Sequence, residues 1–211
     1  MGKERLGRMF IVKIGGTNGS GKTTLVRSII NKLQMSPNVS SGKPLYYTGT
    51  PPKNLRGYFT RVVVLGSYEN ICGGMDTISS KEEIRALVHS FVDYGDTLSK
   101  DLIIFEGLIT GKTYGYLGEL SERDGQFGKW LYVLLNTPYD VCVSNIISRR
   151  NARGNASSFD PEKTVLPTYR ACHSTIERAA SKGHPHLYLE YGETEDMINN
   201  LLSKVASCIK T

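Results

Sequence analysis

The chain has 211 residues, of which 39% are hydrophobic and 22% are charged, a composition typical of ordinary globular proteins. No apolar run approaches the roughly 18 residues that a membrane-spanning helix needs. The four cysteines lie far apart with no C-x-x-C pair, which favours free thiols in a reducing cytoplasm over a disulfide framework or a zinc site. The net charge of +6 is compatible with a polyanionic partner but does not require one.

The first predicted elements are a strand at residues 9–14 and a helix at about residues 22–33. The strand is an apolar run, and the helix has Leu25, Ile29 and Leu33 at helical spacing. Between them, residues 16–23 read Gly-Thr-Asn-Gly-Ser-Gly-Lys-Thr and match the pattern G-x-x-x-x-G-K-[ST]. A strand before this pattern and a helix after it form the context of a phosphate-binding loop.

The residue types of this loop suit a bound phosphate. Glycines permit backbone conformations that other residues avoid, so that successive N–H groups can converge on an anion. Lys22 is expected to neutralise the β- and γ-phosphates and Thr23 to hold Mg²⁺, while the start of the helix adds its positive end. We therefore expect ATP with Mg²⁺ to contact nine residues: Gly16, Thr17, Asn18, Gly19, Ser20, Gly21, Lys22, Thr23 and Thr24.

Two apolar segments come next, at residues 43–47 and 58–66, and we expect them to form a β-excursion near residues 45–66. The same region combines aromatic with basic side chains. It could follow a nucleic acid strand by stacking and charge, with Lys53, Arg56 and Arg61 engaging backbone phosphates. It could equally be a half-buried hairpin with a solvated basic face, and the sequence leaves both alternatives open.

Two acidic residues occupy positions suited to catalysis. Glu106 follows the apolar strand predicted at residues 101–105, where the carboxyl end of a strand faces the ligand crevice of an α/β sheet. With Thr23 it is expected to position Mg²⁺, directly or through water. Asp76 lies in a glycine turn before a helix capped by Ser79 or Ser80. Asp76 is a candidate general base for a hydroxyl acceptor; a turn aspartate is the alternative, and Glu106 is the rival base.

The second half of the chain continues with strands at residues 130–135 and 187–190 and helices at 138–150, 161–181 and 193–210. The first of these helices ends in Arg149 and Arg150, and Arg153 follows in a polar segment at residues 151–160. We expect an arginine-bearing lid at about residues 149–160 that closes over the phosphates. Arg150 and Arg153 are the expected catalytic contacts, with Arg149 and Arg150 at the nucleotide. The alternative is that the arginines only complement the end of a helix.

These motifs, with the Phe105-Glu106-Gly107 strand end and the Asn136-Thr137-Pro138 turn, make the chain resemble the nucleoside-monophosphate-kinase-like branch of P-loop kinases. The resemblance spans nearly the whole length. It implies an α/β P-loop NTPase fold in a single domain, residues 1–211, with a five-stranded, mainly parallel sheet flanked by helices and a lid. The chain departs from thymidylate and adenylate kinases because it lacks a clear arginine motif for an acceptor phosphate after the second strand.

The segment from Gly16 to Arg27, the excursion and the Gly73-Gly74-Met75-Asp76 turn also look like bacteriophage P-loop kinases of DNA hypermodification. That resemblance implies phosphorylation of the hydroxymethyl oxygen of 5-hydroxymethyluracil already present in DNA. The expected partner is DNA carrying a modified pyrimidine, in the cytoplasm of the host cell. Two alternatives remain open: a kinase of free nucleosides or nucleoside monophosphates, and a non-catalytic nucleotide-binding module.

Overall fold

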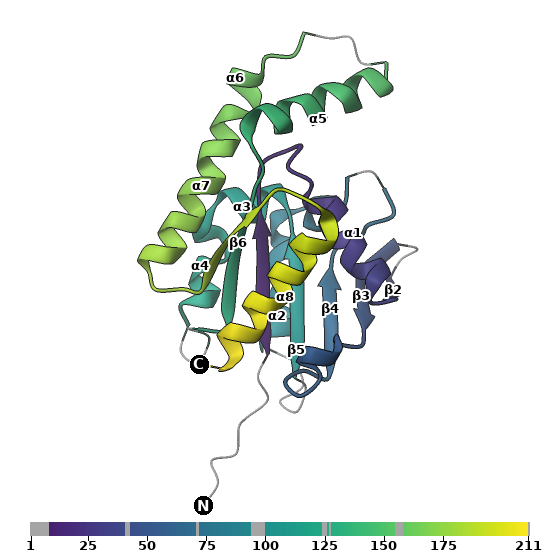
Figure 1. The fold of residues 1–211 in the computed structure, drawn as a ribbon, viewed down its shortest axis with the longest axis vertical. Helices are drawn as coiled ribbons and strands as arrows, with labels where there is room; N and C mark the ends of the chain where they lie inside the picture. Colours follow the sequence, from purple (N-terminus) through teal and green to yellow (C-terminus); the bar gives the residue numbers. More distant parts are fainter. Residues whose placement is uncertain are drawn as a thin grey trace, which may run out of the picture.

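The computed structural model describes residues 9–40, 43–70, 72–93, 100–123, 126, 128–154 and 158–210. The strands of these residues form one seven-stranded sheet in the order β2-β3-β4-β5-β1-β6-β7, with helices on both of its faces (Figure 1). The strands are β1 (Phe10–Gly15), β2 (Ser36–Ser40), β3 (Lys43–Gly49), β4 (Arg61–Leu65), β5 (Asp101–Glu106), β6 (Trp130–Asn136) and β7 (His186–Glu190).

The helices cover the two faces of the sheet as separate layers. Helices α1 (Lys22–Lys32) and α8 (Thr194–Lys210) pack on one face. The other face carries α2 (Lys81–Asp93), α4 (Tyr114–Ser121) and α7 (Leu166–Ser181), with the short α3 (Leu108–Lys112) beside them. The remaining helices are α5 (Tyr139–Ala152) and the four-residue α6 (Pro161–Thr164). None of the helices within the described residues is long and apolar enough to cross a membrane.

The core of the sheet is parallel. Strands β4, β5, β1, β6 and β7 are paired in parallel with their neighbours, and β1 lies in the middle of these five. Their near-continuous apolar sequences suit strands that are covered by helices on both faces. The prediction of an α/β fold with a mainly parallel sheet is confirmed, and the carboxyl ends of all five strands meet at one edge.

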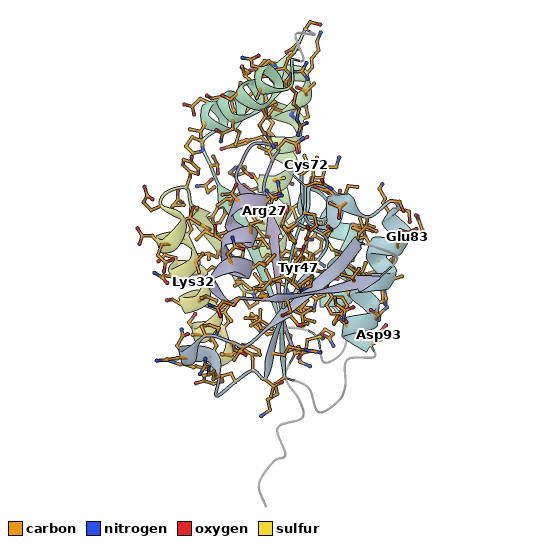
Figure 2. The ribbon with its side chains drawn as sticks, turned by 90° about the vertical axis from the view of Figure 1, so that its right-hand side faces the viewer. Arg27, Lys32, Tyr47, Cys72, Glu83 and Asp93 are labelled. Atoms are coloured by element: carbon orange, nitrogen blue, oxygen red, sulfur yellow. The ribbon has the colours of Figure 1, made fainter. Side chains whose placement is uncertain are left out.

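The predicted count of five strands and the predicted excursion at residues 45–66 are both corrected. Residues 61–65 form β4, which pairs in parallel with β5 and is an internal strand of the sheet. Its residues Val62 to Leu65 are accordingly all buried. The antiparallel extension consists instead of β2 and β3. The exposed, polar β2 has no apolar pattern that reveals a strand. Tyr47 of β3 is buried against Tyr68 and lies inside the body (Figure 2).

Two helix predictions also change in detail. The segment predicted as one helix at residues 161–181 is divided at Val165 into α6 and α7, because Pro167 has no N–H to continue the ladder. Ser80 is the cap of α2, since its hydroxyl accepts a hydrogen bond from the backbone N–H of Glu83 at 3.1 Å. Helices α3 and α4 are short and rich in glycine, and the sequence patterns did not indicate them.

An arm formed by α5, α6 and the start of α7 extends beyond the carboxyl edge of the sheet (Figure 1). Helix α5 begins directly after β6, and Tyr139 in its first turn packs edge-on against Tyr169 of α7, with ring centroids 5.6 Å apart. The arm is therefore attached to the sheet by a strand end and held from the side by a long helix.

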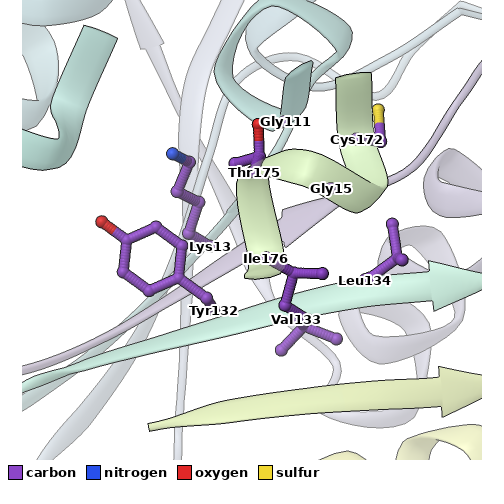
Figure 3. Close-up of a pocket in the computed structure, with 9 residues that line it drawn as sticks. All are labelled: Lys13, Gly15, Gly111, Tyr132, Val133, Leu134, Cys172, Thr175 and Ile176. Atoms are coloured by element: carbon purple, nitrogen blue, oxygen red, sulfur yellow. The ribbon is translucent and has the colours of Figure 1, made fainter. Parts of the chain in front are cut away.

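Lys13 is an exception in the apolar core. It lies in the middle of β1 with 2% of its surface exposed, and its amine has no hydrogen-bond partner among the described residues. The amine sits 4.8 Å from the centre of the Tyr132 ring, beside a small cavity that Cys172 and Thr175 also line (Figure 3). Burial lowers the pKa of Lys13 from its usual 10.5 to about 7.

Replacing Lys13 by Met is expected to stabilise the fold and to change how stability depends on pH. Above about pH 7 the unfolded chain binds a proton at Lys13 that the folded protein does not. The wild-type free energy of unfolding should therefore rise with pH between 7 and 10.5, by at most about 1.4 kcal/mol per unit. Denaturant unfolding between about pH 7 and pH 8.5 tests this.

The Lys13→Met protein should lack that slope, whereas Lys210→Met, at an exposed position of α8, should keep it. Because the other titrating groups are common to all three proteins, only the difference between their slopes matters. Equal slopes in wild type and Lys13→Met would contradict the assignment of a buried, uncompensated amine.

Candidate active site at the carboxyl edge of the sheet

The candidate site lies where the central strand β1 and its neighbour β5 end. Ile14 of β1 is in register with Glu106 of β5, so the loop after β1 begins beside that carboxylate. The loop of residues 16–21 then leads into α1 at Lys22. The parallel pairing therefore brings together two motifs that are more than 80 residues apart in the sequence.

The phosphate-loop motif has the backbone conformation that its glycines predict. Gly16, Gly19 and Gly21 all have positive φ, at 154°, 81° and 93°. Two observations exclude a side chain at Gly19: its φ is positive, and a Cβ atom there would lie 2.3 Å from the carbonyl oxygen of Cys142. The Lys22 side chain is buried, and its amine donates to the Thr17 carbonyl at 3.0 Å. The amine is thus held against the loop whose bound phosphates it is predicted to neutralise.

Glu106 is joined directly to this loop. The Thr23 hydroxyl donates a hydrogen bond to Glu106 Oε1 at 2.9 Å, and only 1% of Glu106 is exposed. Burial raises the pKa of the Glu106 carboxyl to about 7, although the Lys22 charge and the Thr23 hydroxyl act in the opposite direction. A buried carboxylate that is so costly to ionise is a place where a cation would be stabilising.

A magnesium ion fits this pair of side chains. Hydroxyl and carboxylate oxygens are the ligands that Mg²⁺ prefers, and in phosphate-transfer sites the remaining ligands come from water and the substrate phosphates. Among the described residues no group of three or more His, Cys, Asp or Glu side chains could hold a metal by itself. Thr23 and Glu106 therefore suit a metal that arrives with phosphates.

Asp76 lies on the neighbouring 3₁₀ turn, Met75–Thr77, and is exposed. Its carboxylate accepts hydrogen bonds from the backbone N–H of Leu108, at 2.7 and 3.0 Å, and of Ile109, at 3.5 Å. It therefore caps the first turn of α3 from outside. Its negative charge also contributes to raising the pKa of Glu106. Asp76 and Glu106 thus belong to one site, but the capping bonds leave the role of Asp76 a prediction.

A loop after β4 closes the site from the other side, and it is held there by Arg27 of α1, whose role the sequence patterns did not indicate. Arg27 Nε donates to the Tyr68 carbonyl at 2.9 Å, and its charge also lowers the pKa of Glu106. Arg27 lies one turn beyond Thr23 on α1, so helical spacing could have identified it. Arg27 of α1 and Cys72 of the loop after β4 are both labelled in Figure 2. A Cβ atom on Gly74 would lie 2.4 Å from Glu106 Oε1, so the loop packs directly on the carboxylate.

Helix α5 carries the arginine segment above the phosphate loop. The Asn145 side chain donates to the Gly19 carbonyl at 2.9 Å, and Arg149, one turn later, lies on the same side of the helix. Arg150 instead stacks on Phe159, with its guanidinium carbon 5.1 Å from the ring centre. Arg153 is exposed just after the helix. Residues 155–157 of the predicted lid lie outside the described residues, and the phosphate contacts of Arg149, Arg150 and Arg153 stay predictions.

Arg170 of α7 is another arginine near the arm, and it lies away from these three. It follows Tyr169, which packs on Tyr139 at the start of α5. The arginines lie at the other end of this 14-residue helix, about 20 Å away at 1.5 Å per residue.

The basic side chains predicted to engage DNA phosphates, Lys53, Arg56 and Arg61, come from the later part of the stretch at residues 45–61, whereas Tyr47 at its start contacts Tyr68 of the loop after β4. Phe59 is buried in the core, and Arg61 pairs with Asp101 at 2.5 Å. Both partners of this pair begin their strands, so they lie at the edge opposite the phosphate loop. Lys53 follows β3, which runs antiparallel to β4 and ends at that same far edge. Lys53 and Arg61 therefore lie at the edge of the sheet opposite the phosphate loop, and their contact with DNA phosphates stays a prediction.

Comparison with known proteins finds three phage relatives that carry the same name. The chain is 30% identical over 179 residues to a 5-hmdU DNA kinase of Pseudomonas phage PaMx11, covering 83% of this chain and 87% of that protein. A 5-hmdU DNA kinase of Delftia phage PhiW-14 is 24% identical over 205 residues, which cover 90% of this chain and 73% of that protein. A third, from Pseudomonas phage M6, is 25% identical over 153 residues, covering 69% and 74%. No family model matches the chain.

Solved structures align over most of the chain but with low similarity. Deoxyadenosine kinase from M. mycoides with bound dCTP is 14% identical, covering 94% of this chain and all of that one, with a TM-score of 0.45. A gluconokinase from Sinorhizobium meliloti 1021 is also 14% identical, covering 94% and 92%, with a TM-score of 0.46.

Replacing Lys22 by Ala is expected to weaken the binding of ADP at least tenfold, about 1.4 kcal/mol, because the loop loses the buried positive charge that faces the phosphates. The thermal unfolding temperature should change little, since the amine bonds to the Thr17 carbonyl of its own loop. Calorimetric titration measures the affinity. Lys32→Ala, on the same helix but paired with Glu195 at the surface, is the matched control and should bind ADP like wild type. Equal affinity in the two variants would rule out the phosphate-loop assignment.

Proposed function

Because the chain belongs to the family of 5-hmdU DNA kinases, we propose that it transfers the γ-phosphoryl group of ATP to the hydroxymethyl oxygen of 5-hydroxymethyluracil in DNA. The observation that carries the proposal is the Thr23–Glu106 hydrogen bond. This bond unites the phosphate loop with a buried acid at the end of the adjacent strand, which is the arrangement that magnesium-dependent phosphoryl transfer requires.

The donor side of the site consists of the phosphate loop and the start of α1. The backbone N–H groups of residues 16–23 would surround the β- and γ-phosphates, and the Lys22 amine would leave Thr17 to neutralise them. Thr23 and Glu106 would hold Mg²⁺. When bound, this ion supplies positive charge that stabilises the transferring phosphoryl group. Arg149, on the side of α5 that faces the loop, is suited to approach the same phosphates.

The acceptor side is bounded by Asp76 and the loop that contains Tyr68. In the transfer step the hydroxymethyl oxygen forms a bond to the γ-phosphorus while the bond from that phosphorus to the bridging oxygen breaks. ADP leaves with the bridging oxygen, and the hydroxyl proton passes to Asp76. The bonds from Leu108 and Ile109 would fix the direction of this carboxylate, and its exposure leaves it open to the acceptor.

A base inside a duplex must leave the stack before its hydroxymethyl group can reach this edge of the sheet. The flanking phosphates of DNA would then lie near the carboxyl edge and the arm, not near Lys53 and Arg61 at the far edge. Arg153, exposed after α5, is the kind of side chain that would meet them. Because the relatives are phage proteins, we place the reaction on phage DNA in the cytoplasm of the host cell.

The acceptor is tested with labelled ATP, Mg²⁺ and matched substrates. Label should appear on DNA that contains 5-hydroxymethyluracil and not on the same DNA with thymine, because thymine lacks the accepting hydroxyl. The free nucleoside should be a far poorer acceptor, since it lacks the backbone phosphates. Lys53→Ala should label the DNA at the wild-type rate because Lys53 lies at the far edge. Efficient labelling of a free nucleoside or nucleotide with DNA inert would make the protein a metabolite kinase, and labelling of neither would make it a nucleotide-binding module.

The roles of the two acids are tested by Asp76→Asn and Glu106→Gln. The amide that Asp76→Asn introduces would still accept a hydrogen bond from α3 but could not take a proton. The rate of transfer should therefore fall by about a hundredfold or more, while the Kd for ATP barely changes. Glu106→Gln should instead raise the Mg²⁺ concentration needed for half-maximal activity. A normal rate in Asp76→Asn together with a shifted pH profile in Glu106→Gln would reverse the two roles.

A further inference from the structure

The phosphate loop has an outer side as well as an inner one. In a trans peptide the N–H and the C=O point in opposite directions, so a loop whose N–H groups face an anion must turn its carbonyl groups outward. Those carbonyls need hydrogen-bond donors if they are buried, because an unpaired buried carbonyl costs free energy. The loop can therefore keep its shape only if something outside it supplies the donors.

Two side chains from the β6–α5 segment supply them. The Thr137 hydroxyl donates to the Ser20 carbonyl at 2.7 Å, and the Asn145 amide donates to the Gly19 carbonyl at 2.9 Å. Thr137 is 1% exposed, so water cannot replace its hydroxyl. The peptides held in this way carry the N–H groups of Gly21 and Ser20, and the Ser20 N–H donates to the Thr17 carbonyl of the same loop at 3.3 Å.

Direct packing strengthens this connection. A Cβ atom at Gly19 would approach the Cys142 carbonyl to 2.3 Å and the Ile146 side chain to 3.1 Å, so α5 lies against the loop without a gap. Figure 1 places α5 across the top of the loop between β1 and α1. The glycine at position 19 therefore serves a contact with the arm in addition to its backbone conformation.

We propose that Asn145 and Thr137 are positioning residues that hold the phosphate loop in its binding conformation from outside. Neither side chain needs to touch the substrate. By fixing the Gly19–Ser20 and Ser20–Gly21 peptides, they hold the backbone of the loop in one conformation before ATP arrives, and this lowers the ordering cost of binding. This inference rests on the proposed function of the loop as the site of the ATP phosphates.

The same contacts give the arm a defined position relative to the phosphates. Asn145 and Arg149 are one helical turn apart, and Arg149 Nε is 3.4 Å from the Asn145 carbonyl. Because one turn of helix is rigid, the bond between Asn145 and the loop also fixes the position of Arg149 relative to the loop. Loss of the bond should loosen the loop and Arg149 together, both on the nucleotide side of the site, and should leave the groups that contact DNA in place.

Four variants of the full-length protein test the proposal. Thr137→Val and Asn145→Leu keep the side-chain shape but remove the donor, whereas Thr137→Ser keeps the hydroxyl. Asn200→Leu, at an exposed position of α8, controls for the change of amide to alkyl. The measurements are the Kd for ADP by calorimetry, the KM values for ATP and for 5-hydroxymethyluracil DNA, and the thermal unfolding temperature.

Thr137→Val and Asn145→Leu should each raise the Kd for ADP and the KM for ATP roughly fivefold, the loss of one hydrogen bond, with the KM for DNA unchanged. Thr137→Ser and Asn200→Leu should behave like wild type. If Thr137→Val fails to fold, the half-buried Asn145→Leu decides the question. Wild-type affinity in the folded donor-less variants, or an equal rise in both KM values, would overturn the proposal. Failure of wild type itself to bind ADP would instead reject the proposed function.

Discussion

The buried carboxylate of Glu106 is the group around which the site is built. It ends β5 beside the central strand, with 1% of its surface exposed, and it accepts a hydrogen bond from Thr23 of the phosphate loop. An ionised carboxylate in such a place is costly unless positive charge and donors surround it. Lys22 and Arg27 both act on it from α1, and a bound magnesium ion would complete the compensation. The acid thus links binding of the metal and phosphates to the stability of the site.

The loop after β4 depends on the same acid. Gly74 packs on the Glu106 side chain, and a Cβ atom on Gly66 would lie 2.4 Å from the Gly74 backbone, so this loop has little freedom to move away. Arg27 fastens it to the phosphate-loop helix through the Tyr68 carbonyl. The loop after β4, the Glu106 carboxylate and the phosphate loop are therefore packed against one another, and under the proposed function they would form the acceptor side, the metal site and the donor side.

The arm connects to that unit through the outer side of the phosphate loop. Thr137 and Asn145 satisfy carbonyl groups that the loop must turn outward if its N–H groups are to face a phosphate. Arginines placed on α5 are consequently held in relation to the nucleotide by hydrogen bonds at the base of the helix. Under the proposed function the base of α5 would shape the phosphate site, and the arginines at its other end would contact phosphates.

The sequence by itself determined the local parts of this protein. The phosphate loop between a strand and a helix, the acid at the end of an apolar strand and the α/β class all follow from residues that are close together in the chain, where spacing and side-chain type carry the information. The tertiary structure decided which strands are neighbours. An apolar run such as Val62 to Leu65 fits an excursion or a core strand equally well, and only its pairing with β5 places Arg61 at the far edge. The bonds of Arg27 to Tyr68 and of Asn145 to Gly19 join residues 41 and 126 positions apart. No local pattern specifies such contacts, because they arise only when the packing of the sheet and its helices brings the two backbones together.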